Sequence, residues 1–443
     1  MTHPAIAALL LQVPDPQLPP PGVATFLIAT VVKMLVVFTV YMVGVALLTL
    51  AERKVSAWIQ DRIGPNRVGP GGLLQPAADG VKNFMKEESA PAGVNKSLFN
   101  LAPMLAFIPA LLTWAVIPFG AAWASPWGRI EMVVADLPIG FLFTLAISSL
   151  GVYGIVLAGW ASNNKYSLLG GLRASAQLIS YEIALGMSTI PVLLLAGNVT
   201  LNTIVNQQAS MIWNAFGLTI AFFVFLVSAF AETNRLPFDM PEAESELIAG
   251  YHTEYSAMKF SLFFIAEYAN MVTQSALMAT LFLGGWDIPF MARDNGDAVG
   301  LGWVALSVLI FLAKVLAFLF FFMWIRWTLP RFRYDQLMSL GWKFMLPLAL
   351  AYIVVSASAI LALDYAGLAR GWQFGLAMFA LNVVIVVLLF VILDRGRIIS
   401  PAYSTAGPAE IGRLRARAGR GSIMTGAETR ELLPSAATTA VGD

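Results

Sequence analysis

The sequence predicts an all-α integral membrane protein with nine transmembrane helices, an outer N-terminus, a cytoplasmic C-terminus and one cytoplasmic amphipathic helix. Of its 443 residues, 58% are hydrophobic and only 12% are charged, and the mean hydropathy is +0.75. A soluble domain carries about twice that charged fraction. Because one globule cannot hide so many apolar side chains from water, lipid is the expected solvent for most of them.

Nine stretches are apolar over about the twenty residues that a helix needs to cross a bilayer core. They lie near residues 26–50, 98–120, 137–160, 177–197, 213–231, 258–284, 301–325, 344–363 and 372–393. With the N-terminus outside, the cytoplasmic loops, their borders and the tail carry 22 of the 27 Lys and Arg residues, and the outer side carries three. This positive-inside bias sets the predicted orientation.

The chain divides into four predicted parts. These are an external Pro-rich segment 1–25, an eight-helix membrane core 26–364, an additional ninth transmembrane helix 365–394 and an Arg-rich cytoplasmic tail 395–443. The tail is expected to be disordered or to lie on the membrane surface. It is either simply solvated or in contact with anionic lipid or an acidic partner.

Cysteine is absent from the sequence, and His3 and His252 are its two histidines. The chain alone therefore offers no thiolate for a disulfide, an Fe–S cluster or a Cys-ligated metal. His3 lies in the Pro-rich segment, which also argues against a bis-His haem in the membrane. Metal centres of any redox reaction are expected on partner subunits.

The first cytoplasmic loop begins with the charges of Glu52 and Arg53 and continues through Arg62 into a Gly/Pro-rich stretch. Apolar residues then recur at helical spacing over 73–85, and Asp79 lies on the polar face between them. Such a helix suits the membrane surface, where a simple interfacial anchor explains it equally well. Charges beside an amphipathic lid also suit the mouth of a chamber for an amphiphile.

An acidic loop follows the fifth predicted span. Its residues 231–254 hold one arginine, Arg235, and six carboxylates, Glu232, Asp239, Glu242, Glu244, Glu246 and Glu254. Crowded carboxylates raise one another's pKa, so some are expected to exchange protons near neutral pH. A solvated acidic loop without a function is the alternative.

Ionisable residues also lie within the predicted spans. Glu182 and Glu267 fall in the cytoplasmic halves of the fourth and sixth spans, and Lys314 lies near the middle of the seventh. An intramembrane charge is costly and is a functional candidate by default. Together with Glu232, the two carboxylates predict a proton or polar path that enters from the cytoplasmic side. Lys33, near the outer end of the first span, is expected to extend its amine to the interface.

Several long motifs occur in order along the chain. They are Glu52-Arg53-Lys54, the segment DRIGPN at 61–66, GLLQPAADGVK at 72–82, KYSLLGGLR at 165–173, AETNR at 231–235 and PFDMPEAESELIAG at 237–250. These motifs resemble those of the H-type membrane subunit, the quinone-site subunit, of respiratory complex I (NADH:quinone oxidoreductase). The resemblance covers roughly residues 26–364.

The resemblance implies an eight-helix core that forms a quinone chamber with two hydrophilic partner subunits. Ubiquinone or menaquinone would be the substrate, reduced by an Fe–S cluster of a peripheral-arm subunit, and the reduction would be coupled to proton translocation. The chain would have no activity alone, and no Fe–S cluster, flavin, haem or metal is expected on it. Small membrane subunits, antiporter-like subunits and the lipid of the cell membrane are the other implied partners; nucleic acid is not.

The resemblance also implies roles for individual residues. The entrance and quinone site would be lined by Glu52, Arg53, Arg62, Asp79 and Arg235. The coupling or proton path would use Glu182, Glu232, Asp239, Glu242, Glu244, Glu246, Glu267 and Lys314. The ninth span and the tail lie beyond the matching motifs, and their role stays open.

Three other functions remain open on the sequence. The homologous subunit of a membrane-bound hydrogenase would share these motifs, and neighbouring genes for a Ni–Fe subunit would indicate it. A stand-alone ion or solute transporter is favoured by the buried acids and would be active without a redox assembly. A structural scaffold would tolerate neutral substitutions at Glu182 and Glu267.

Overall fold

The structure, a computed structural model, describes residues 22–239, 250–287 and 298–393. The chain divides into two compact units, Met1–Asn382 and Val383–Asp443, and the description below concerns the first. The Arg-rich tail and almost all of the Pro-rich segment 1–25 lie outside the described residues. So do Glu242, Glu244 and Glu246 of the acidic loop.

Helices occupy the positions of all nine predicted spans. They are α2 Val23–Ile59, α4 Lys96–Leu112, α5 Gly140–Ala161, α6 Lys165–Ala196, α9 Thr219–Glu232, α10 Ala257–Phe282, α11 Leu301–Thr328, α13 Leu346–Tyr365 and α14 Trp372–Leu393. Within the described part of the chain, seven helices are long and apolar enough to cross a membrane. The protein is therefore a mostly helical, multi-pass membrane protein.

The two remaining helices depart from an ordinary span for different reasons. Helix α9 has only 14 residues, because the chain breaks at Leu218 after the short helix α8, Asn214–Gly217. At 1.5 Å per residue α9 is about 21 Å long, against about 30 Å for a hydrocarbon core. Helix α10 has 26 residues but carries the charges of Lys259 and Glu267.

Shorter elements connect the long helices. They are η1 Pro70–Gly72, α3 Gln75–Met85, η2 Thr113–Val116, α7 Leu201–Ser210, η3 Gly250–His252, α12 Tyr334–Ser339 and the π-helical turn η4 Leu340–Met345. Strands β1 Trp123–Ser125 and β2 Gly128–Ile130 form an antiparallel hairpin between α4 and α5. The all-α prediction is wrong for this hairpin. Its strands have three residues each, too few for an alternating pattern to be recognised.

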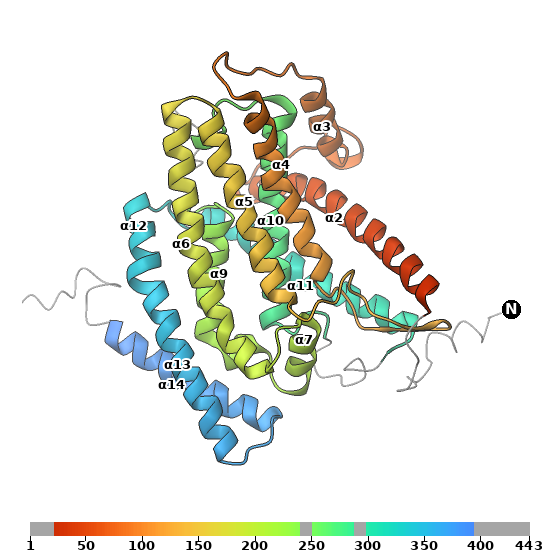
Figure 1. Cartoon of the computed structure of the whole chain (residues 1–443), viewed down its shortest axis with the longest axis vertical. Coiled ribbons are helices and arrows are strands. Elements are labelled where there is room, and N and C mark those ends of the chain that lie inside the picture. The colour runs from red at the N-terminus through yellow and green to blue at the C-terminus, as the bar shows by residue number, and fades with distance from the viewer. Residues whose placement is uncertain (1–21, 240–249, 288–297, 394–443) are drawn as a thin grey trace, which may run out of the picture. The chain divides into compact units, whose positions relative to one another are not determined.

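Helices α4, α5, α6 and α9 run side by side, and α10 packs on α4 and α9 (Figure 1). Small residues allow the close approach. A Cβ atom on Gly154 of α5 would lie 2.7 Å from the backbone nitrogen of Ala106 in α4, and one on Gly159 would lie 2.8 Å from the carbonyl oxygen of Ser167 in α6. Glycine is the residue that membrane helices use for such contacts.

Helix α2 continues past its predicted end at residue 50 through the charged residues to Ile59. Its buried residues lie in the second half, where Tyr41 donates a hydrogen bond to the carbonyl of Ala269 in α10 (2.9 Å). Near its outer end, Lys33 donates to the carbonyl oxygens of Glu131 (3.0 Å) and Val133 (2.6 Å). The Lys33 amine is thus bound by protein carbonyls and does not simply extend into the interface.

The segment that follows α9 is attached to α6. The Gln177 amide nitrogen donates to the carbonyl oxygens of Ala231 (2.9 Å) and Phe238 (2.9 Å) and to Asn234 Oδ1 (3.0 Å). The Ser167 hydroxyl donates to the carbonyl of Tyr251 (2.7 Å). Both ends of the acidic loop that the structure describes are therefore fixed to one helix.

Candidate functional site

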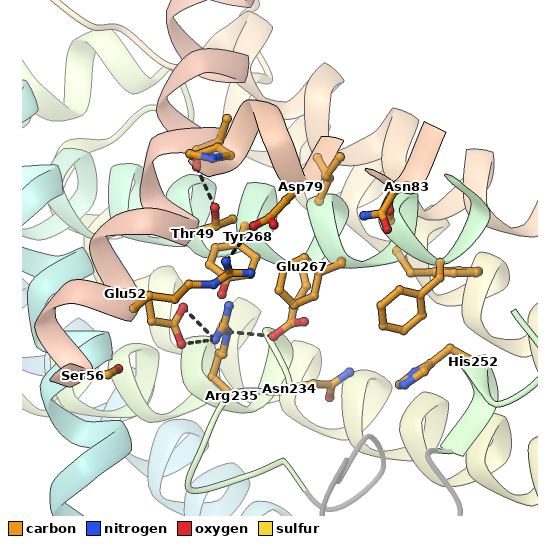
Figure 2. Close-up of a pocket in the computed structure, with 18 of the residues that line it drawn as sticks. Thr49, Glu52, Ser56, Asp79, Asn83, Asn234, Arg235, His252, Glu267 and Tyr268 are labelled. Atoms are coloured by element: carbon orange, nitrogen blue, oxygen red, sulfur yellow. Dashed lines mark hydrogen bonds and ion pairs between the residues drawn. The ribbon is translucent and has the colours of Figure 1, made fainter. Parts of the chain in front are cut away.

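A cavity of about 1060 Å³ lies where the cytoplasmic ends of several helices predicted to face that side come together. Its walls come from α2, α3, the segment 234–239, α10 and the end of α11. Figure 2 shows the polar side chains that point into it, among them Glu52, Arg235, Glu267, Asp79 and His252. Most of these residues are far apart in the sequence, so the fold itself assembles the site.

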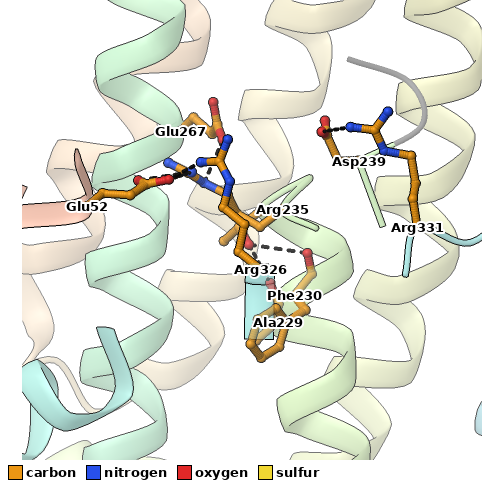
Figure 3. Close-up of polar contacts among 9 residues, drawn as sticks. Glu52, Ala229, Phe230, Arg235, Asp239, Glu267, Arg326 and Arg331 are labelled. Carbon is orange, nitrogen blue, oxygen red and sulfur yellow. Dashed lines mark hydrogen bonds and ion pairs between the residues drawn. The ribbon is translucent and has the colours of Figure 1, made fainter. Parts of the chain in front are cut away.

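A network of buried ion pairs forms one wall of the cavity (Figures 2 and 3). Arg235 Nη1 donates to both carboxylate oxygens of Glu52, at 2.9 and 3.1 Å, and Arg235 Nε lies 2.7 Å from Glu267 Oε1. Arg326, from the last turn of α11, also contacts Glu52. Glu52 is 4% and Arg235 8% exposed. Three helices and one loop are thereby joined through charge.

Arg235 keeps its charge in this buried position. Burial opposes the charged form, but the carboxylates of Glu267 and Glu52 outweigh it and hold the pKa of Arg235 above its ordinary value. The guanidinium also lies 4.3 Å from the ring centroid of Tyr268, a cation–π contact. Removing one partner from such a buried pair is strongly destabilising, because an uncompensated charge remains.

His252 lines the same cavity but stays neutral. Its ring packs edge-on against Tyr251 and Phe260, at centroid distances of 5.1 and 5.4 Å. Burial lowers the pKa of His252 to about 4. The imidazole is therefore uncharged at neutral pH and can offer one donor and one acceptor to a ligand.

The mouth of the cavity is bounded by the amphipathic helix α3, whose prediction is confirmed. Arg53 Nη1 lies 2.7 Å from Asp79 Oδ2 and ties α2 to α3, while the Lys54 amine donates to the carbonyl of Gly71 (2.6 Å). A Cβ atom on Gly72 would lie 2.2 Å from the carbonyl oxygen of Pro65, so this turn requires glycine. On the opposite face of α3, Phe84 is 78% exposed.

A second, smaller cavity of about 60 Å³ adjoins the first. Its polar lining includes Glu182 of α6, Glu232 at the end of α9 and Glu267 of α10. The Ser149 hydroxyl donates to Glu182 Oε1, and no described residue donates to the buried Glu232 Oε2. Glu267 lines both cavities, so one carboxylate faces the large chamber and the small acidic one.

The family model described as NADH dehydrogenase matches residues 32–357. This range includes every residue of both cavities. The chain belongs to the NADH dehydrogenase family.

Curated members of the family cover most of the chain. The first of two H-type subunits of NADH-quinone oxidoreductase from Cytophaga hutchinsonii is 51% identical over 336 residues, which are 76% of this chain and 98% of the relative. The H-type subunit from Leptospira biflexa is 50% identical over 340 residues, 74% of this chain and 93% of the relative. One from Geobacter metallireducens is 52% identical over 324 residues, 73% and 94% of the two chains.

In this NADH dehydrogenase family member, the predicted site residues fall into three groups. The large cavity brings together Glu52, Arg53, Arg62, Asp79, Arg235, Asp239 and Glu267. The small cavity brings together Glu182, Glu232 and Glu267. Lys314 lies elsewhere, and Glu242, Glu244 and Glu246 lie outside the described residues.

Lys314 is bound at the outer end of α10. Its amine donates to the carbonyl oxygens of Leu283 (2.7 Å), Gly285 (2.9 Å) and Asp287 (2.9 Å). It also lies 4.8 Å from the ring centroid of Trp213. Glu267 and Leu283 are 16 residues apart along α10, about 24 Å at the rise of a helix. The structure therefore separates Lys314 from the carboxylates of the predicted proton path.

Sequence reasoning missed two arginines of the site. Arg326 contacts Glu52, and Arg331 Nη2 lies 3.0 Å from Asp239 Oδ2 (Figure 3). In the sequence both contribute only to the charge bias between the two membrane sides. The available signal was the position of Glu52 beside a span, because a buried carboxylate requires a partner of opposite charge.

Metal binding has no candidate in the parts of the chain that the structure describes. Residues 22–239, 250–287 and 298–393 contain no group of three or more His, Asp or Glu side chains that could hold a metal ion.

Proposed function

We propose that the chain is the membrane subunit of a proton-translocating NADH:quinone oxidoreductase, which forms the quinone chamber with peripheral-arm subunits and couples quinone reduction to proton translocation. The observation that carries the proposal is Glu267, because this one carboxylate borders both the large cavity and the small acidic cavity. The relatives are named as H-type subunits of NADH-quinone oxidoreductase, which supports the reaction and the quinone substrate.

The large cavity suits an amphiphile such as ubiquinone or menaquinone. Ligand pockets of about 300–1,000 Å³ enclose drug-sized molecules, and this one reaches the upper end of that range. Its wall holds charged groups for a polar head, and the apolar face of α3 beside the mouth suits lipid. Glu52, Arg53, Arg62, Asp79 and Arg235 are the residues proposed to line the entrance and the head-group site.

Coupling would pass through the Arg235–Glu267 pair. Quinone reduction takes two electrons and two protons, so it changes the charge in the chamber. In one arrangement Arg235 pairs with Glu267; when chamber charge draws Arg235 away, Glu267 becomes a better proton acceptor. Its proton would then be shared with Glu232 and Glu182 across the small cavity. The carboxylates of Asp239, Glu242, Glu244 and Glu246 are proposed to report the state of the chamber to this pair.

The electron donor and the remaining machinery would belong to other subunits. We propose contacts with peripheral-arm Fe–S and quinone-site subunits on the cytoplasmic side, and with small and antiporter-like subunits in the membrane. Nine spans with a cytoplasmic C-terminus, and the division at 1–25, 26–364, 365–394 and 395–443, complete the proposed arrangement in the cell membrane. The names of the relatives favour this assembly over a hydrogenase-type complex.

Replacing Glu267 with Gln in the assembled complex tests the proposal. The change keeps the size of the side chain but removes its proton exchange. We expect NADH:quinone turnover and proton translocation both to fall at least tenfold, while NADH oxidation with a soluble artificial acceptor stays normal. Glu88, a surface residue paired with Lys259 (2.9 Å), supplies the matched control Glu88→Gln. Unchanged turnover and translocation in Glu267→Gln would refute the proposal.

A further inference from the structure

Helix α14 has no role in the proposed function. It begins at Trp372, whereas the family match ends at residue 357. The Cytophaga relative is covered over 98% of its length by only 76% of this chain. The first half of α14, up to Asn382, belongs to the same compact unit as both cavities.

The backbone near this helix is interrupted inside an apolar region. Helix α8 ends at Gly217 and α9 begins at Thr219, with Leu218 at φ −132° and ψ 50° between them. A continuous helix would bring the Ala221 N–H to the Gly217 carbonyl. Among the described residues that carbonyl instead accepts a hydrogen bond from Asn382 Nδ2 of α14. An unsatisfied backbone group at this depth would cost several kcal/mol, on the order that lipid imposes.

Asn382 has every polar atom directed to a specific partner. Its Nδ2 donates to the Gly217 carbonyl and to the carbonyl of Met378 (2.9 Å). Its Oδ1 accepts a hydrogen bond from the Tyr352 hydroxyl of α13 (2.6 Å). The residue is 1% exposed. A polar side chain buried in this way fixes one orientation of the helix that carries it.

The packing around Asn382 is equally specific. A Cβ atom on Gly375 would lie 2.5 Å from Ile212 Cγ2 and 3.3 Å from the Ile212 backbone nitrogen, so glycine permits the contact. Phe379 meets the ring of Phe216 edge-on at 6.3 Å. The first half of α14 is therefore seated on the segment that contains the helix break.

We propose that Asn382 is a positioning residue. Its amide replaces the missing helical N–H at the Gly217 carbonyl, and the first half of α14 thereby braces the broken helix α8–α9. The brace acts on α9, which ends at Glu232. It concerns the stability of the break and does not depend on what Glu232 does, so it can fail while the proposed function holds, and the reverse.

Amide hydrogen exchange in the assembled complex tests this proposal. In Asn382→Leu we expect the amides of residues 218–223 to exchange about three to ten times faster, the effect of one lost interhelical hydrogen bond. Asn382→Gln keeps an amide donor and should restore most of the protection. Leu376 is exposed on the same helix, so Leu376→Ala serves as the matched control and should leave exchange unchanged.

A second pair of variants separates the carbonyl contact from the Tyr352 contact. Tyr352→Phe leaves Asn382 Nδ2 on the Gly217 carbonyl and should change exchange little. Because removing both partners of a buried hydrogen bond is nearly neutral, the double variant Tyr352→Phe/Asn382→Leu would regain protection if only the tyrosine pair mattered. We expect no such recovery. Recovery, unchanged exchange in Asn382→Leu, or equally fast exchange in Asn382→Gln would each overturn the proposal.

Discussion

Helix α10 carries a buried charge network near its cytoplasmic half and receives a second buried charge at its other end, and the two are satisfied differently. At Glu267 the partners are ionisable side chains from a loop and, through Arg235, from α2 and α11. At the outer end the Lys314 amine is held by the backbone, through three carbonyl oxygens.

This difference teaches that a buried charge is not by itself a functional site. Carbonyls at a helix end carry partial negative charge and attract a cation permanently, because they do not titrate. Paired side chains that border a cavity can exchange partners and protons. The Glu52–Arg235–Glu267 network meets that condition, since all three residues line the large cavity. The kind of partner, together with access to a cavity, separates a helix cap from a reaction site.

The largest effect is expected from Arg235→Leu, which would break the network at its centre. Two buried carboxylates would lose their shared cation, at a cost of about 3–5 kcal/mol. We expect less assembled complex and at least a tenfold loss of NADH:quinone turnover per complex. Arg235→Lys should be intermediate, because an ammonium keeps the charge but not the fork that spans two carboxylates. Turnover near the wild-type value in Arg235→Leu would erase the contrast between the two ends of α10.

A smaller and different effect is expected from Lys314→Met. The variant leaves three carbonyl oxygens without this donor, so the complex should be less stable, by about 1–3 kcal/mol. Turnover per assembled complex should stay within about twofold of wild type, since the site lies about 24 Å from Glu267. Heat-inactivation midpoints and turnover measured on the same preparation give both numbers. Normal stability with a large loss of turnover would instead return Lys314 to the proton path.

The smallest effect concerns His252, a buried titratable group with aromatic neighbours. Its pKa is about 4 in the fold and about 6.5 when unfolded, so the unfolded chain binds the extra proton between these values. Stability is therefore fully present above pH 6.5 and declines as the pH falls toward 4, by up to about 2 kcal/mol at about pH 5. His252→Asn should reduce the drop in the heat-inactivation midpoint between about pH 7.5 and 5. An equal drop in both proteins would show that His252 is not the group that titrates.

The long helices and the amphipathic helix could be predicted because their signals are local. Apolar runs of about twenty residues, and the alternation of faces over 75–85, are visible in any window of the sequence. The Glu52, Arg235 and Glu267 positions were also found, because charges beside spans stand out. The sequence could therefore identify the members of the site without showing how they pair.

The pairings themselves depend on contacts between distant residues. Arg235 and Glu52 are 183 positions apart, and Arg326 and Glu52 are 274 apart. No spacing rule connects such residues, so Arg326 and Arg331 stand out in the sequence only as cytoplasmic charges. The break at Leu218 was missed for a related reason. The apolar run continues through it, and only the donor from Asn382 makes the interruption tolerable.

The shortness of α9 has a consequence for the bilayer. A helix of about 21 Å exposed to lipid would create a hydrophobic mismatch and draw the membrane thinner around it. Of its residues only Phe223 is exposed, at 55%, so α9 is enclosed by protein and the mismatch is not felt by lipid. Enclosure lets the helix end early. Glu232 can then lie deeper than the end of a full-length span would allow, at a depth set by neighbouring helices and insensitive to membrane thickness.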